Sequence, residues 1–441
     1  MRLLPPPKYV PLLATALVLG GLFVAGAFRY ENFGTLGNVL GTIRGQAMLG
    51  VVAIGATFVI LSGGIDLSVG AVVALTGMIV AAALPSGVQV VVPEDNPVRQ
   101  ITRDQLRQVY AGEITNLKQL GGPDRAIVPV TRELASSAHD SFMKHVMAGR
   151  PLADRVQYVN DDSEVKARVQ GEAGAIGYVD LYYAPRGLGR LMIDGEHGVQ
   201  VGLNPALAIA MALAAGLAIG AGMGCLIHFF ELPAFLVTLA GMFFARGAGF
   251  VIHTRSIPIK HPFFLRTVNE DLVIPLGGHL EIPLAVIVLL ALLAAALVLA
   301  HWTRFGRNVY AIGGSENSAR LMGLGVGRTK ILIYTLAGLC SAIGGVVWTF
   351  ELQSGDPLQA GLGMELDAIA AVVIGGTLLS GGVGFVAGTL MGVLILGLIK
   401  AIITFENINS WWTKIIMGML LLAFILLQNF VTKASMRRKK T

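Results

Sequence analysis

The strongest constraint in this sequence is a series of ten apolar segments, each near the length that crosses a lipid bilayer. A spanning helix needs about 20 apolar residues. The ten segments are roughly Pro11–Phe28, Ala47–Ser62, Leu67–Leu84, Asn204–Phe230, Ala234–Ile252, Pro283–Ala300, Lys330–Trp348, Leu366–Ser380, Phe385–Ile403 and Trp412–Leu427. The second and eighth are short and interrupted by glycine, so we expect them to be tilted, broken or only partly crossing. The pattern predicts an all-α polytopic membrane protein with about ten transmembrane helices.

One charged segment departs from this apolar pattern. From Val91 to Val201 the chain holds 15 Asp and Glu and 13 Lys and Arg in 111 residues, which leaves 12 acids and 20 bases for the other 330. That charge density is typical of a soluble domain. The tetrapeptide Gly87–Val90 is repeated as Gly198–Val201 at the two edges of this segment. We therefore predict a small α/β domain inserted into a loop, with the boundaries 1–90 for the first transmembrane part, 91–197 for the insert and 198–441 for the second transmembrane part.

Lys and Arg set the expected orientation. They concentrate near the N-terminus, in the loop 301–329 and in the C-terminal tail, and loops rich in these residues stay in the cytoplasm. Ten crossings place all three regions inside and the insert outside, in the periplasm of a Gram-negative cell. We therefore expect a multi-pass protein of the cell inner membrane. Membrane topology accounts for the net charge of +6, which is no argument for a nucleic-acid partner.

Several kinds of chemical motif are absent from the sequence. No Gly-Lys dipeptide occurs, so there is no P-loop to hold ATP phosphates. The eight His never fall at metal-ligand spacing, and Cys225 and Cys340 lie in apolar segments, where free Cys packs as a small hydrophobe. We expect no cofactor, no metal and no ATP hydrolysis by the chain itself.

Three of the charged residues in or beside apolar segments are candidates for the substrate path or for an intramembrane charge. Asp66 follows Gly63-Gly64-Ile65 at the start of a segment, where it can cap a helix or take part in a solute path. Acids within a membrane usually face a cavity or a partner, although Asp367 is close enough to a helix start to be a cap. Arg246 lies near the middle of the fifth segment, and pairing with Asp367 or Asp66 is left open.

The basic loop after Trp302 is predicted to hold a short docking helix. Ser315 can cap a helix over Glu316–Met322 that ends at Gly323. Ala319 and Met322 lie three apart and so share a face, which suits docking in a groove of a motor domain. A solvated basic loop is the alternative. The residues assigned to this coupling segment are Arg307, Ser315, Glu316, Arg320 and Met322.

Five stretches together resemble the permease subunits of ABC importers for ribose, galactose and galactofuranose. They are Leu61–Met78, Leu232–Ala248, Thr303–Gly327, Tyr334–Val347 and Glu365–Leu394, in the order found in that family. The resemblance implies a pore-forming subunit for a sugar, without its own ATPase and surrounded by membrane lipid. Its partners would be a second permease subunit, identical or different, a cytoplasmic ABC ATPase and a periplasmic sugar-binding protein.

The insert alternates strand and helix signals, which predicts an α/β unit. The predicted elements are strand 88–92, helix 103–110, strand 127–131, helix 137–147, strand 156–159, helix 164–170 and strand 175–179. Thr102 and Gln105 read as a capping box. The insert resembles one lobe of phosphate-type periplasmic binding proteins, through the stretches Asn96–Val98, Ile101–Pro123, Ile127–Leu134 and Gly174–Asp180.

That family binds its anion with an Arg after a strand and a Ser-Gly-Thr at a helix N-terminus. The corresponding residues here are Arg132, Ser136, Ser137 and His139, with Ala138 and His139 standing where the Gly and Thr would be. The second lobe of the clamp is missing. We expect a non-binding or altered site, with phosphate binding as the lesser alternative.

Two other functions stay open at this point. A secondary transporter would use the buried charges for ion coupling and would need no ATPase. A membrane receptor would sense an anion through the outer lobe.

Overall fold

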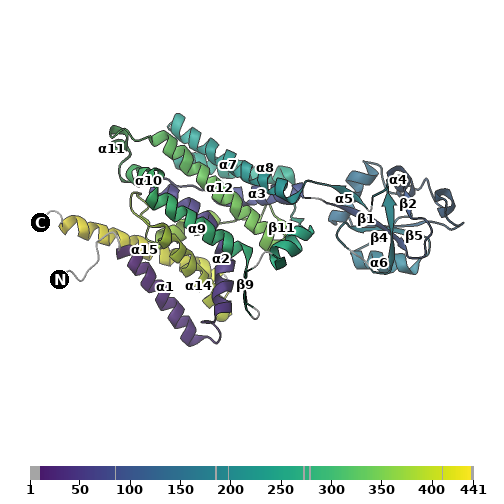
Figure 1. The fold of residues 1–441 in the computed structure, drawn as a ribbon, viewed down its shortest axis with the longest axis horizontal. Helices are drawn as coiled ribbons and strands as arrows, with labels where there is room; N and C mark the ends of the chain where they lie inside the picture. The colour runs from purple at the N-terminus through teal and green to yellow at the C-terminus, as the bar shows by residue number, and fades with distance from the viewer. Residues whose placement is uncertain are drawn as a thin grey trace. The chain divides into compact units, whose positions relative to one another are not determined.

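The computed structural model describes residues 10–84, 86–183, 186–196, 198–271, 274–277, 280–409 and 411–438. The chain divides into a helical unit and an α/β unit, which are described separately below (Figure 1). The helical unit comprises Met1–Ala82, Ala206–Ile259 and Phe263–Thr441, and the α/β unit comprises Ala83–Pro205 with Lys260–Pro262. The terminal basic residues within 1–9 and 439–441 lie outside the described residues.

Each of the ten predicted apolar segments contains a helix. These helices are α1 (Val10–Arg29), α2 (Leu36–Leu61), α3 (Val69–Ala83), α7 (Pro205–Phe229), α8 (Ala234–Ile252), α9 (Leu284–Trp302), α12 (Val326–Leu352), α13 (Met364–Ile374), α14 (Val386–Phe405) and α15 (Trp411–Arg438). Among the described residues, seven of them are long and apolar enough to cross a membrane. At 15 and 11 residues, α3 and α13 are shorter.

The two segments predicted to be short differ in outcome. The prediction is wrong for the second, because α2 begins at Leu36, where the Thr35 side chain accepts a hydrogen bond from the Asn38 N–H, and it runs for 26 residues. The eighth is short as predicted. α13 ends at Ile374 because Gly375 and Gly376 follow, and Gly376 takes a left-handed φ of +92°.

α2 forms the centre of the helical unit. Its residues from Leu49 to Leu61 are all buried, and it packs against α9, α12, α13 and α14. Small residues allow helices to approach closely. A Cβ placed on Gly220 of α7 would lie 2.3 Å from the Tyr334 carbonyl oxygen of α12, and Gly55 of α2 meets Cys340 of α12 in the same way. The predicted packing role of Cys340 is therefore confirmed.

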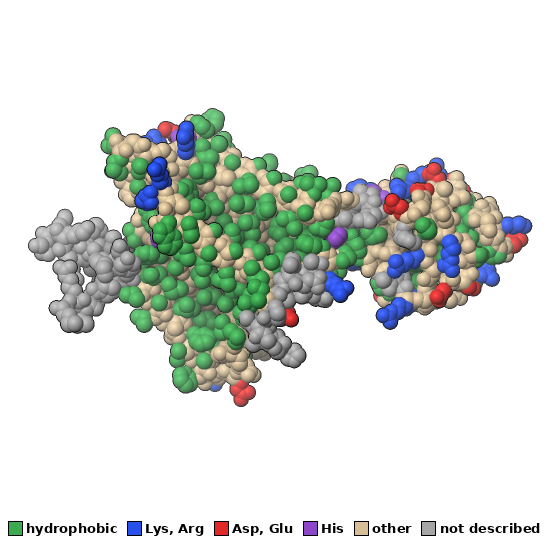
Figure 2. All heavy atoms as spheres, viewed as in Figure 1, with side chains coloured by type: hydrophobic (Ala, Val, Ile, Leu, Met, Phe, Trp, Pro, Cys, Tyr) green, Lys and Arg blue, Asp and Glu red, His purple; other side chains and the backbone are tan. Residues whose placement is uncertain are grey.

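Apolar side chains cover most of the visible face of the helical unit (Figure 2). On the helical unit as a whole, the exposed large apolar side chains include Phe243, Phe244 and Val251 of α8. Patches of this extent are rare on soluble proteins, and a lipid solvent accounts for them. The connections of the unit hold short elements, namely β8 (Ile257–Pro258), η4 (Phe263–Asp271), β9 (Ile274–Gly277), β10 (Leu280–Ile282), α10 (Arg304–Gly314), α11 (Glu316–Leu321) and β11 (Ser354–Gly355).

The α/β unit is built on a mixed sheet in the order β2-β6-β1-β5-β3-β4, with β7 paired to β1. Its elements are β1 (Ser86–Pro93), β2 (Gln100–Ile101), α4 (Arg103–Ala111), η2 (Leu117–Leu120), β3 (Val128–Arg132), α5 (Ser137–Phe142), η3 (Met143–Met147), β4 (Gln157–Val159), α6 (Asp162–Gly171), β5 (Ala175–Asp180), β6 (Leu188–Ile193) and β7 (Val199–Val201). All seven predicted elements are present, and β2, η2, β6 and β7 were missed. The capping box of Thr102 and Gln105 is confirmed.

The repeated tetrapeptide has a structural counterpart. The two copies lie antiparallel in β1 and β7, where Gly87 pairs with Gln200 and Val88 with Val199. Both copies therefore lie within the α/β unit, as the paired strands through which the chain enters and leaves it.

Candidate functional site

The predicted docking helix of the coupling segment forms as α11. The Ser315 side chain accepts a hydrogen bond from the Ser318 N–H at 3.3 Å and caps the helix. The helix covers Glu316–Leu321, and Gly323 follows with a left-handed φ of +76°, which favours glycine. The local shape of the segment is thus the one that its sequence predicts.

The outward face of α11 differs from the predicted one. Ala319 is fully buried in a small cluster with Ile312 and Val326, so it does not share an exposed face with Met322. The exposed apolar side chains here are Leu321, at 90% exposure, and Met322, at 67%. Helical spacing alone cannot tell which stripe of a short helix faces its own domain, and for this reason Leu321 was missed.

Ion pairs connect α11 to α12 and to the connection between α7 and α8. Glu316 accepts from Lys330 of α12 at 2.7 Å and from Arg320 at 2.9 Å. Arg320 also lies 3.9 Å from Glu231, in the connection between α7 and α8. Burial raises the pKa of Glu316, but the hydrogen bonds and charges of Lys330 and Arg320 outweigh it, so the pKa is lowered and the carboxylate stays ionised. Arg307, on α10, is exposed.

A polar cavity of about 580 Å³ lies beside this charge cluster. Five segments of the helical unit line it: the turn after α2, the end of α7, the α7–α8 connection, α11 and the first turns of α12. Ser62, Glu231, Glu316, Arg320 and Lys330 supply polar side chains to its wall.

Asp66 shapes the start of α3. Its Oδ1 accepts hydrogen bonds from the Ser68 N–H at 2.8 Å and the Ser68 hydroxyl at 2.7 Å, one residue before the helix begins at Val69. The prediction that Asp66 caps the helix is therefore wrong: its carboxylate closes a turn on Ser68, ahead of α3, and no described hydrogen bond joins it to an N–H of α3 itself. Asp66 is buried, and its Oδ2 has no hydrogen-bond partner among the described residues.

The other two charged residues have partners that the sequence did not indicate. Asp367 of α13 forms an ion pair with Lys400 of α14 at 3.7 Å. Arg246 of α8 donates to the carbonyl oxygens of Pro357 at 3.2 Å and Ala360 at 2.9 Å, in the connection between α12 and α13. The described contacts therefore do not pair Arg246 with Asp66 or Asp367, and the three residues serve separate parts of the fold.

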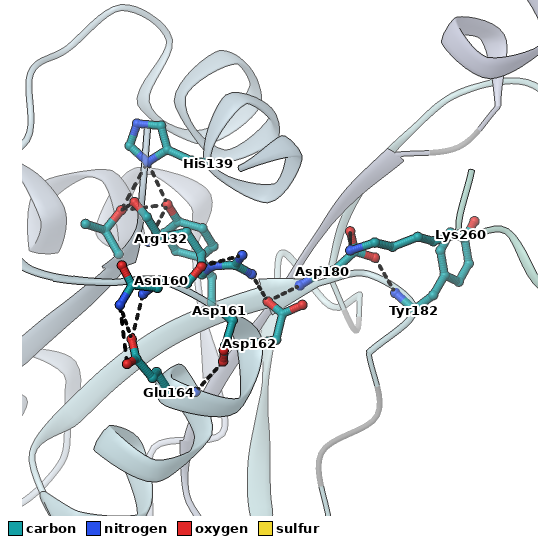
Figure 3. Close-up of polar contacts among 11 residues, drawn as sticks. Arg132, His139, Asn160, Asp161, Asp162, Glu164, Asp180, Tyr182 and Lys260 are labelled. Atoms are coloured by element: carbon teal, nitrogen blue, oxygen red, sulfur yellow. Dashed lines mark hydrogen bonds and ion pairs between the residues drawn. The ribbon is translucent and has the colours of Figure 1, made fainter. Parts of the chain in front are cut away.

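The degenerate anion site of the α/β unit is drawn in Figure 3. Arg132, at the end of β3, forms an ion pair with Asp162 at the start of α6 and donates to the Asn160 carbonyl oxygen at 3.1 Å. Only 11% of the Arg132 side chain and 14% of the Asp162 side chain are exposed. The Asp162 carboxylate of the chain itself therefore takes the place beside the Arg132 guanidinium that a bound anion would need.

The remaining predicted residues surround the first turn of α5. His139 is buried, and its Nδ1 lies 3.2 Å from the Tyr178 hydroxyl and 3.3 Å from that of Thr131. Burial lowers the pKa of His139 and raises that of Tyr178 to about 12. Ser136 is the N-cap residue but makes no side-chain capping bond, and Ser137 begins the helix. The cluster is neutral apart from Arg132 and its partner.

Two family descriptions match the sequence. "Branched-chain amino acid transport system / permease component" matches residues 183–425, and "PBP superfamily domain" matches residues 76–212.

Curated relatives are membrane permeases. The inner membrane ABC transporter permease protein YjfF of Escherichia coli K12 is 48% identical over 232 residues, 52% of this chain and 69% of the relative. The ribose import permease protein RbsC of the same strain is 39% identical over 233 residues, 52% of this chain and 71% of the relative. The fructose import permease protein FruG of Bifidobacterium longum is 38% identical over 212 residues, 47% of this chain and 62% of the relative.

Solved structures similar to this chain are phosphate-binding proteins. A putative phosphate ABC transporter substrate-binding protein from Clostridium perfringens is 33% identical with a TM-score of 0.25 and covers 26% of this chain. An ABC-type phosphate transport receptor from Vibrio cholerae is 29% identical with a TM-score of 0.26 and covers 26% of this chain. The chain spans 47% and 50% of their respective lengths.

Proposed function

Because the chain belongs to the family of branched-chain amino acid transport system permease components, we propose that it is the membrane-spanning permease subunit of an ATP-binding-cassette sugar importer. The observation that carries this proposal is the family match over 183–425, more than half of the chain, together with relatives that import ribose and fructose. The helices and their apolar surface provide the membrane domain that such a subunit requires.

In this proposal ten helices cross the inner membrane, and both termini lie in the cytoplasm. The count adds α3, α13 and α15 to the seven helices that are long enough by themselves. The α/β unit, with its sequence boundaries at the repeated tetrapeptide, is then periplasmic. Loop charge supports this orientation, because the basic connection between α9 and α12 falls on the same side as the termini.

The coupling segment is the part that meets a separate ATPase. Leu321 and Met322 project from a capped helix beside Arg320, and exposed apolar side chains of this kind seat in a groove of a partner protein. The chain itself hydrolyses no ATP in this scheme. Its other partners are a second permease subunit, a periplasmic sugar-binding protein, the sugar and membrane lipid, and nucleic acid is not among them.

The three candidate residues Arg246, Asp367 and Asp66 have distinct roles in this proposal. Arg246 fixes the α12–α13 connection through two carbonyl oxygens, and Asp367 with Lys400 joins α13 to α14. Asp66 keeps one carboxylate oxygen without a partner among the described residues. A buried polar atom of this kind is costly unless it is used, so Asp66 is the residue of the three best suited to contact the sugar.

The α/β unit does not bind phosphate in this proposal. Asp162 neutralises Arg132, and the second lobe that would close over an anion is absent from the stretch 86–201. This argues against the anion-sensing receptor. Asp367 is already paired with Lys400, which weakens the case for an ion-coupled transporter.

The test is uptake of radiolabelled ribose, fructose and galactose by proteoliposomes that contain the full chain with its ATPase and sugar-binding protein. We expect uptake that requires ATP and all three components. Uptake driven by an ion gradient in vesicles of the chain alone would establish a secondary transporter. ATP turnover by the purified chain, free of other proteins, would contradict the absence of an ATPase in this subunit.

A further inference from the structure

The four charged residues beside the polar cavity form a chain of alternating sign: Glu231, Arg320, Glu316 and Lys330. It joins three separate segments, because Glu231 lies between α7 and α8, Arg320 and Glu316 lie on α11, and Lys330 lies on α12. With two acids and two bases, these four residues together carry no net charge.

The links in this chain differ in strength. Glu316 lies 2.7 Å from Lys330 and 2.9 Å from Arg320, and the side chains of Glu316 and Lys330 are only 35% and 21% exposed. The link between Arg320 and Glu231 is 3.9 Å long, and the Glu231 side chain is 78% exposed. Exposed, long ion pairs contribute little, so this link breaks first when α11 moves. α11 then stays tied to α12 while the α7–α8 connection is released.

The released connection carries backbone strain. Glu231 has a φ of +52°, in the left-handed region that a residue with a Cβ seldom adopts. It lies in the short stretch between Phe229, where α7 ends, and Ala234, where α8 begins. Relief of this strain favours another backbone conformation of the turn once the weak ion pair breaks.

We propose that Arg320 and Glu231 form a latch that holds the α7–α8 connection closed over the polar cavity. Both are positioning residues: they set the access of water and solute to the cavity. The cavity, about 580 Å³, is of a size that holds a small ligand, and its polar, charge-balanced wall suits an uncharged hydroxylated solute better than an anion. The use of this latch in transport rests on the proposed function, because α11 moves only if it docks on an ATPase.

A thiol inside the cavity reports whether the latch is closed. Ser62 lines the cavity and is half-buried, so Ser62→Cys places the reporter there. Cys225 is replaced by Ala to remove its partly exposed thiol, and the buried Cys340 is kept. The full chain is labelled with a small maleimide in lipid nanodiscs, where both membrane faces are accessible and the orientation of the chain does not matter.

Glu231→Lys replaces attraction to Arg320 with repulsion and leaves the left-handed backbone cost unchanged. We expect the labelling rate to rise about twofold to fivefold, the range that an exposed pair supports. In an Arg320→Gln background, where residue 320 carries no charge to repel the new lysine, Glu231→Lys should raise the rate less than it does in the parent; the lost link to Glu316 is common to both members of this comparison and cancels. The matched control is Glu406→Lys, an exposed acid that pairs with Arg29 and does not line the cavity. Its rate should equal the parent rate.

The latch is wrong if Glu231→Lys labels at the parent rate, or if Glu231→Lys raises the rate by the same factor in the Arg320→Gln background. A rise of equal size in Glu406→Lys also overturns it, because a general charge effect then explains the result. Labelling needs neither ATPase nor sugar. A chain whose labelling follows the charges but which imports no sugar therefore refutes the proposed function and leaves the latch standing, and the converse result refutes the latch alone.

Discussion

Asp162→Asn should destabilise the α/β unit and open its anion site. The Arg132 and Asp162 side chains are 11% and 14% exposed, so the variant leaves a nearly buried guanidinium without its counter-charge. Removing one partner of a buried pair costs about 3–5 kcal/mol. Arg132 keeps its hydrogen bond to the Asn160 carbonyl oxygen, so we expect a cost near the lower limit, about 3 kcal/mol.

Hydrogen exchange measured by mass spectrometry on the full chain is the suitable assay. All four Trp lie outside 86–201, so tryptophan fluorescence follows only the helical unit and serves as the control for an intact membrane domain. A loss of about 3 kcal/mol lowers protection of the β3 and α6 amides roughly 100-fold, since each 1.36 kcal/mol is a factor of ten.

Millimolar phosphate gives the second readout. In Asp162→Asn the freed guanidinium can pair with phosphate, so phosphate should restore part of the lost protection. In the parent chain the site is filled by Asp162, and phosphate should have no effect. Glu164→Gln is the matched control: Glu164 is an exposed acid of α6 that accepts from the Asn160 N–H at 2.6 Å, and its loss should cost about 1 kcal/mol.

Two results would refute this reasoning. Phosphate protection of β3 and α6 in the parent chain would show that Asp162 does not block the site. Equal hydrogen exchange in the parent and in Asp162→Asn would show that the Arg132–Asp162 ion pair contributes nothing to the stability of the α/β unit.

Three further predictions concern the coupling segment, the insert and pH. Leu321→Asp should reduce co-purification of the ATPase at least about tenfold, because burying an unpaired charge costs several kcal/mol; Asn317→Asp, an exposed substitution on the same helix, should not, and equal loss in both would contradict the docking face. Deletion of 91–201 should leave membrane insertion intact and raise uptake, and failure to insert would disprove the insertion boundaries. Because burial lowers the pKa of His139, the unfolded state takes up a proton at a pH where the folded state does not, so this contribution to stability is present above the unfolded pKa of about 6.5 and is lost as the pH falls through the lowered folded pKa. His139→Gln should flatten that loss in hydrogen exchange corrected for intrinsic rates, and an unchanged pH profile would count against it.

Local sequence determined most of the elements and their ends. Apolar runs predicted helices in all ten segments, and alternating strand and helix signals predicted seven elements of the insert. The caps at Ser315 and Thr102 were predictable because a side chain there bonds to a backbone N–H only three residues away. Strands β2 and β7 were missed because each is so short that it carries little pattern of its own.

Tertiary structure alone decided the partners of the charged residues. Asp162 is 30 residues from Arg132, Lys400 is 33 residues from Asp367, and Arg246 bonds to carbonyl oxygens more than 100 residues away. No local spacing encodes these distances, because they depend on which helices and strands pack together. The same holds for Ala319 and Leu321: periodicity places both on α11, but only the packing of Ala319 against Ile312 and Val326 leaves Leu321 facing outward.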